Sequence, residues 1–219
     1  VKGPQLALLL GMARECDLPL EGFIDAGVAA ATTWPGSGRF LHVDLHLHKT
    51  LITAVGVGER VRRERWELAA SAGWSAFVDC WMRMIAREFV AQTRFDPLHQ
   101  AATEQQLYLS LPDWLAVLSS QETVDVGIET GDGTFSATLR REQFTLAAEA
   151  WYAQLAELVH AGHRADESVT LALSSRAGAL PALGEPWTMR TRASVATLRR
   201  SSVSTSGSMF ARKSTASTE

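Results

Sequence analysis

Four side chains that can bind metal ions or carry protons alternate with apolar residues in the stretch FLHVDLHLHKTLITAV, residues 40–55. These side chains are His42, Asp44, His46 and His48, and they alternate with Leu41, Val43, Leu45 and Leu47. In an extended strand successive side chains point to opposite faces, so the four polar groups would share one face. The pattern predicts two short strands that meet near His48 and a polar face that is equipped for chemistry.

The first interpretation of this polar face is a metal site. Neutral imidazoles and carboxylates are common ligands of zinc and similar ions. Residues i to i+6 of a strand spread over about 20 Å, so only neighbours such as His46 and His48 can share one ion. Further ligands must come from elsewhere, and Asp79, Glu104 and His163 are candidates. This interpretation assigns His46 and His48 as ligands of a metal-dependent hydrolase.

Two other interpretations need no metal. The stretch can be a phosphate-binding hairpin in which the side chains of His46, His48 and Lys49 replace backbone donors as phosphate contacts. It can also be a polar strand face that looks into a cleft or a subunit contact, with its histidines hydrogen-bonded. The residue pattern alone leaves all three interpretations open.

Composition narrows the function classes. The chain has 219 residues, of which 46% are hydrophobic and 21% charged, as in an ordinary globular protein. A net charge of -3 argues against nucleic-acid binding by bulk electrostatics. Two cysteines without a CxxC motif fit a reducing cytoplasm, and the apolar run at 6–13 is far shorter than the roughly 20 residues of a membrane span. The chain begins at Val1, and we expect it to be a piece of a longer protein.

Hydrophobic periodicity predicts the elements that position the stretch. A first helix over 4–16 is expected to bury the stripe formed by Leu6, Leu9, Leu10 and Ala13. The other predicted elements are a short strand at 22–24, an Ala-rich helix at 25–31, a third antiparallel strand at 60–68, helices from 74 to before Asp96-Pro97, at 101–111 and at 144–159, a hairpin at 123–139 and a strand at 169–173. Their order predicts an α/β or α+β domain over residues 1–187. Residues 188–219 are rich in Ser, Thr and Arg, and we expect a disordered tail there.

Five segments in this order resemble the second lobe of the ATPase domain shared by seventy-kilodalton heat-shock chaperones, actin and the bacterial actin-like proteins. They are ARECDLPLEGFIDAGVAAA, HVDLHLHKTLITAV, SAGWSAFVDCWMRMIAREF, LRREQFTLAAEAWYAQL and VTLALSSRAGALPAL. The resemblance implies a ribonuclease-H-like α/β lobe, in which helices flank a mixed sheet containing an antiparallel strand trio. It also implies magnesium-ATP as the cofactor and a preceding lobe of the same protein that this chain lacks.

The chain departs from that family in three implied nucleotide-contact regions, although Asp44, Thr50 and Glu104 are present. The family's phosphate hairpin needs glycines, because only a backbone without Cβ lets several N–H groups approach phosphate closely. Here Leu-His-Leu-His lies between Asp44 and Thr50. Ser174 and Ser175 replace the glycine pair of the adenosine loop, and Glu104, implied to face the ribose, is followed by glutamines with no lysine nearby.

We therefore expect a degenerate ATP site on a retained fold. The expected function is a heat-shock-chaperone-like or actin-like scaffold that binds a protein partner and contacts neither nucleic acid nor membrane. One alternative is an active ATP-binding ATPase, with Asp44 as the catalytic candidate and His46, His48, Lys49 and Thr50 around the phosphates. The other alternative is the metal-dependent hydrolase.

Overall fold

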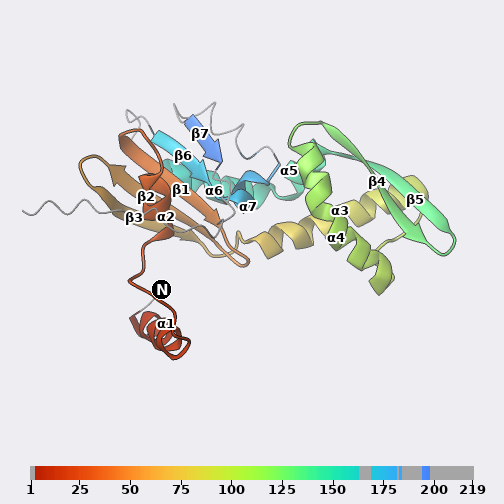
Figure 1. Ribbon diagram of the computed structural model, residues 1–219. Coiled ribbons are helices and arrows are strands. Elements are labelled where there is room, and N and C mark those ends of the chain that lie inside the picture. The colour runs from red at the N-terminus through yellow and green to blue at the C-terminus, as the bar shows by residue number, and fades with distance from the viewer. Residues whose placement is uncertain (1–2, 163–168, 182, 184–193, 198–219) are drawn as a thin grey trace, which may run out of the picture.

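The computed structural model describes residues 3–162, 169–181, 183 and the backbone of 194–197. A mixed five-stranded sheet with the order β3-β2-β1-β6-β7 forms its centre (Figure 1). Strand β1 (Gly38–Leu45) pairs antiparallel with β2 (Thr50–Val57), and β2 pairs antiparallel with β3 (Val61–Ala69). On its other side β1 pairs in parallel with β6 (Val169–Leu173), which pairs in parallel with β7 (Ser194–Thr197). The protein is therefore an α/β protein with an antiparallel strand trio.

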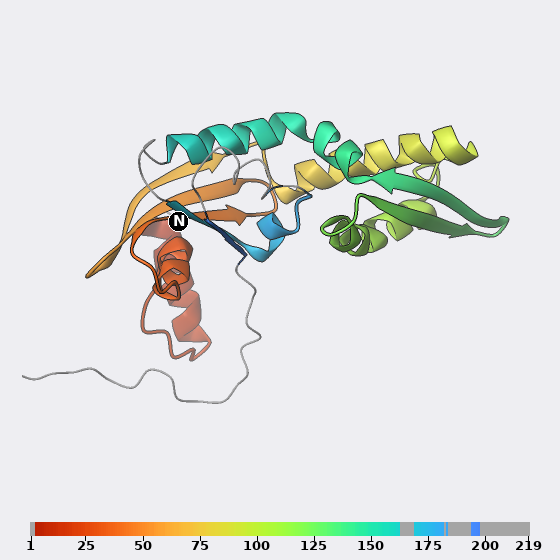
Figure 2. The ribbon, with the colours of Figure 1, turned by 90° about the horizontal axis from the view of Figure 1, so that it is seen from above.

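Helices cover both faces of this sheet, as Figure 2 shows for α2 (Ala26–Thr32) on one side and α6 (Glu149–Ala161) on the other. Alternate residues of β1 enter different cores. Leu41 and Val43 belong to the larger core with α3 and α6, whereas Phe40 packs with Ala31 of α2. Because both faces are covered, the middle of β1 and of β2 is buried without alternation.

An elongated outer part extends from one end of the sheet (Figures 1 and 2). Its elements are α3 (Trp74–Thr93), α4 (Ala101–Leu118), the hairpin of β4 (Thr123–Thr130) and β5 (Gly133–Arg140), and α5 (Arg141–Ala147). Helix α3 packs on β5 and α4 packs on β4. The fully buried Trp81 of α3 donates its indole N–H to the Phe144 carbonyl at 3.0 Å, which ties α3 to α5.

Most of the predicted elements are present. The strand trio, the hairpin and the long helix from Trp74 are confirmed. Helix α4 continues through Pro112 to Leu118, beyond the predicted end at 111. The predicted helix at 144–159 is divided at Ala148 into α5 and α6.

Two predictions near the N-terminus are wrong. Helix α1 (Gly3–Glu15) forms, but only Ala13 of its predicted stripe is buried, and Leu9 is 43% exposed. Residues 22–24 do not form a strand. Apolar periodicity shows which side chains share a helix face, and it does not supply a neighbour to cover that face.

The predicted domain boundary at 187/188 cuts through the sheet. Strand β7 lies in the predicted tail, yet it pairs with β6 over four residues. The expected disorder at 188–193 and 198–219 lies outside the described residues. Among the helices of the described ranges, none combines the length and apolarity that crossing a membrane requires.

Candidate functional site

The turn between β1 and β2, residues 46–49, carries three of the predicted site residues, His46, His48 and Lys49. Strand β1 ends at Leu45, so His46 and His48 belong to the turn and not to the strand face predicted for them. The His46 N–H donates to the Lys49 carbonyl at 2.9 Å and closes the turn. Leu47 is 52% exposed at the tip, in place of the buried position that alternation predicts.

The N-terminus of α3 binds the carbonyl oxygens of this turn. The N–H of Trp74 donates to the His46 carbonyl at 2.9 Å, and the N–H of Ser75 donates to the Leu47 carbonyl at 2.8 Å. The Ser75 hydroxyl donates to the same Leu47 oxygen at 2.9 Å and lies 3.3 Å from Nδ1 of His48. A helix N-terminus is a common anion-binding element because its first N–H groups lack partners in the helix. Here Trp74 and Ser75 direct two of these donors at the protein's own backbone.

Thr50 and Ser174, both implied phosphate or nucleotide contacts, are used inside the protein. Thr50 is fully buried and donates its hydroxyl to the Ala72 carbonyl. The Ser174 hydroxyl accepts from the Leu45 N–H at 3.2 Å and from the Ala177 N–H at 3.4 Å. Ser174 thereby caps the short helix α7 (Ser175–Gly178) and fastens it to the end of β1.

The polar groups of β1 have different environments. Oδ2 of Asp44 lies 3.3 Å from Nε2 of His46, and both side chains are partly exposed beside the turn. His42 is only 5% exposed, and burial lowers its pKa below the ordinary value of 6.5, against the opposing effects of Asp44 and Asp25. His42 is therefore a core residue, whereas Asp44 and His46 form a pair that solvent can reach.

For the metal interpretation, the described residues bring together only two possible ligands, Asp44 and His46. In that part of the chain, no group of three His, Cys, Asp or Glu side chains is arranged to hold an ion. Glu104 lies in the first turn of α4 and Asp79 lies in α3. Burial raises the pKa of Tyr108, and the charges of Asp79 and Glu104 raise it further. His163 lies outside the described residues.

The structure thus brings Asp44, His46, Thr50 and Ser174 to one end of β1, with His48 and Lys49 exposed at the turn. Ser175 is also exposed at this end, at the start of α7. No model of a known protein family matches the chain, and no curated protein matches it.

Sequence reasoning missed the docking of α3 on the turn. The available signal was Gly73 directly before the long helix, where a Cβ would overlap with the His48 backbone. A glycine at the start of a helix has several explanations, so the contact with a turn 25 residues earlier was not readable from the sequence.

Proposed function

We propose that this chain is a ribonuclease-H-like lobe of the actin and heat-shock ATPase type that acts as a protein-binding scaffold and does not hydrolyse ATP. The antiparallel trio β3-β2-β1, continued by the parallel strands β6 and β7, supports this fold. The resemblance of five ordered sequence segments supports it independently. A fold hosts many activities, so the function depends on the turn.

The closed state of the β1–β2 turn carries the proposal. A phosphate hairpin requires open backbone with N–H groups directed at the ligand. In this chain the His46 N–H is bound to the Lys49 carbonyl, and the N–H groups of Trp74 and Ser75 are bound to carbonyls of the turn. The Thr50 hydroxyl is buried against Ala72. The backbone hydrogen bonds of the turn and the buried Thr50 hydroxyl are therefore satisfied within the protein.

Exposed apolar side chains support the protein-binding part of the proposal. Helix α1 projects away from the sheet (Figure 2), and Leu8 is 65% exposed and Met12 56%. The following segment exposes Leu18, Phe23 and Ile24 by half or more. Several large apolar side chains exposed along one segment are typical of a contact with another protein. We call residues 8–24 the N-terminal apolar segment.

The test is calorimetric titration of magnesium-ATP into the chain and into the longest natural protein that contains it. We expect no binding tighter than about 1 mM. Micromolar binding that is lost in Lys49→Gln and Asp44→Asn, and kept in the control Asp113→Asn at an exposed position of α4, would overturn the proposal in favour of a nucleotide binder. Stoichiometric zinc in the purified protein, lost in His46→Gln, would overturn it in favour of the metal-dependent hydrolase.

A further inference from the structure

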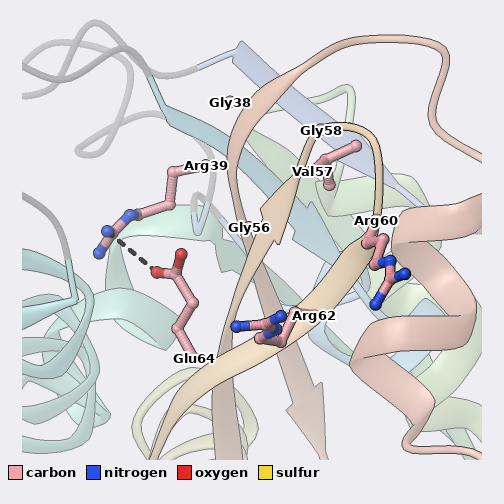
Figure 3. A pocket seen from close by; sticks show the side chains of 8 residues that line it. All are labelled: Gly38, Arg39, Gly56, Val57, Gly58, Arg60, Arg62 and Glu64. Carbon is pink, nitrogen blue, oxygen red and sulfur yellow. Dashed lines mark ion pairs between the residues drawn. The ribbon is translucent and has the colours of Figure 1, made fainter.

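The opposite end of the strand trio holds an arginine-lined pocket of about 410 Å³ (Figure 3). Its lining consists of Gly38, Arg39, Gly56, Val57, Gly58, Arg60, Arg62 and Glu64. Strand β2 runs from the turn at 46–49 to this pocket, over about 23 Å at 3.3 Å per residue. The pocket is therefore separate from the candidate site at the β1–β2 turn.

Strand register creates the pocket. Arg39 of β1 pairs with Gly56 of β2, and Gly56 pairs with Arg62 of β3. Two arginines thus flank a position that has no side chain. Arg62 and Glu64 are two residues apart on β3, so their side chains lie on the same side as the gap over Gly56. Arg60 lies in the loop directly before β3 and completes the lining.

An internal carboxylate already occupies part of this gap. A Cβ added at Gly56 would lie 2.5 Å from Oε1 of Glu64, so the Glu64 carboxylate lies directly over the glycine. Oε2 of Glu64 is 3.0 Å from Nη2 of Arg39, as the dashed line in Figure 3 marks. Arg39 also donates to the Gly162 carbonyl at 3.2 Å, which holds its guanidinium in place. The gap is therefore shaped and charged to receive an oxyanion.

The other two arginines of the pocket are available. Among the described residues, neither Arg60 nor Arg62 has a hydrogen-bond or ion-pair partner, and both are exposed. The neighbouring arginines of β3 differ in this respect, because Arg63 pairs with Asp25 at 2.9 Å and Arg65 pairs with Glu67 at 2.9 Å. Within the described part of the chain, Arg62 is thus the β3 arginine without a partner, and it lines the pocket together with Arg60 of the preceding loop. Three arginines against one glutamate make it positive on a chain whose net charge is -3.

We propose that this pocket binds a small molecule through a doubly charged phosphate group. Guanidinium groups form paired, charge-assisted hydrogen bonds with phosphate oxygens, and the volume suits a small ligand. The ligand displaces the Glu64 carboxylate from Gly56 and takes over Arg39, while Arg60 and Arg62 neutralise its charge. Glu64 is thus an internal competitor that lowers the affinity of the pocket for anions.

The test follows the backbone amides of Gly56 and Gly58 by NMR while sodium phosphate is titrated at pH 7.5 and constant ionic strength. We expect saturable shifts in the intact chain. Arg62→Gln weakens binding about tenfold, because one charged donor is lost. Glu64→Gln tightens it at least about threefold, because the competing negative charge beside Arg39 is removed. Arg65→Gln is the matched control on the same strand, and it leaves the affinity within about twofold because its partner is Glu67.

Three results would overturn the proposal. The first is a set of shifts that do not saturate, or an affinity for phosphate that falls equally in Arg65→Gln and Arg62→Gln. Either outcome would mean that only the general surface charge attracts phosphate. The second is unchanged or weaker phosphate binding in Glu64→Gln, which would show that Glu64 does not compete with the anion for Arg39. The third is a glutamate-rich hexapeptide that binds more tightly than phosphate and is not displaced by saturating phosphate. This outcome would show that the pocket binds acidic peptides. Urea midpoints of all variants check that each is folded.

Discussion

Gly73 lies directly against the backbone of His48, so closely that a Cβ at position 73 would overlap with the His48 carbonyl carbon. The approach allows the first N–H groups of α3 to reach the carbonyls of His46 and Leu47. One residue without a side chain therefore decides whether the β1–β2 turn is closed by the long helix.

Gly73→Ala should destabilise the protein by about 2 kcal/mol, because backbone atoms of the turn cannot move aside as a flexible side chain can. The φ angle of Gly73 is -103°, which alanine adopts freely, so the cost comes from overlap and not from backbone strain. Urea unfolding measures the change. Gly131→Ala is the control, because nothing lies within 4 Å of a Cβ there, and it should be neutral or slightly stabilising. Equal midpoints for the two variants would contradict the close approach.

Ser174→Ala should cost about 1 kcal/mol of unfolding free energy, since the hydroxyl accepts hydrogen bonds from both Leu45 and Ala177. Ser175→Ala should change it by less than about 0.5 kcal/mol, because Ser175 is exposed. Chemical denaturation of the pair separates a structural serine from a surface serine. A larger loss in Ser175→Ala would show that the two roles are reversed.

His42 should make the protein less stable as the pH falls below about 6.5. Burial lowers the pKa of His42 in the folded state, so the unfolded chain takes up the proton more readily. The contribution is complete above the unfolded pKa of 6.5 and is lost as the pH falls toward the lower folded value. Urea midpoints at pH 7.5 and 5.5 should differ less in His42→Gln than in the parent chain. His99→Gln, at an exposed position, should leave the difference unchanged.

The N-terminal apolar segment should promote association with apolar surfaces. Leu8→Gln combined with Met12→Gln changes two exposed residues one helical turn apart, and it should lower apolar-dye binding and self-association. The free energy of unfolding, measured with urea, should change by less than about 0.5 kcal/mol, because neither side chain is buried. Leu109→Gln with Leu146→Gln alters residues that are 70% and 61% exposed elsewhere. If that control reduces association as much, the segment is not the contact surface.

Local patterns in the sequence determined the elements. Alternation at residues 41–45 gave a strand, and apolar spacing from Trp74 to Phe89 gave the long helix, because both depend on which side chains share a face. The Asp-Gly turn at 132–133 marked the β4–β5 hairpin in the same way. These features need no information from distant residues.

Tertiary structure decided the sites, because each depends on contacts between segments far apart in the chain. Ser174 meets Leu45 across 129 positions, and Trp74 closes a turn that precedes it by more than 25. Strand register, which alternation does not fix between three strands, placed Arg39 and Arg62 on either side of Gly56. The same limit applies to α1, whose apolar spacing the sequence displays and whose exposure only the packing of the whole chain determines.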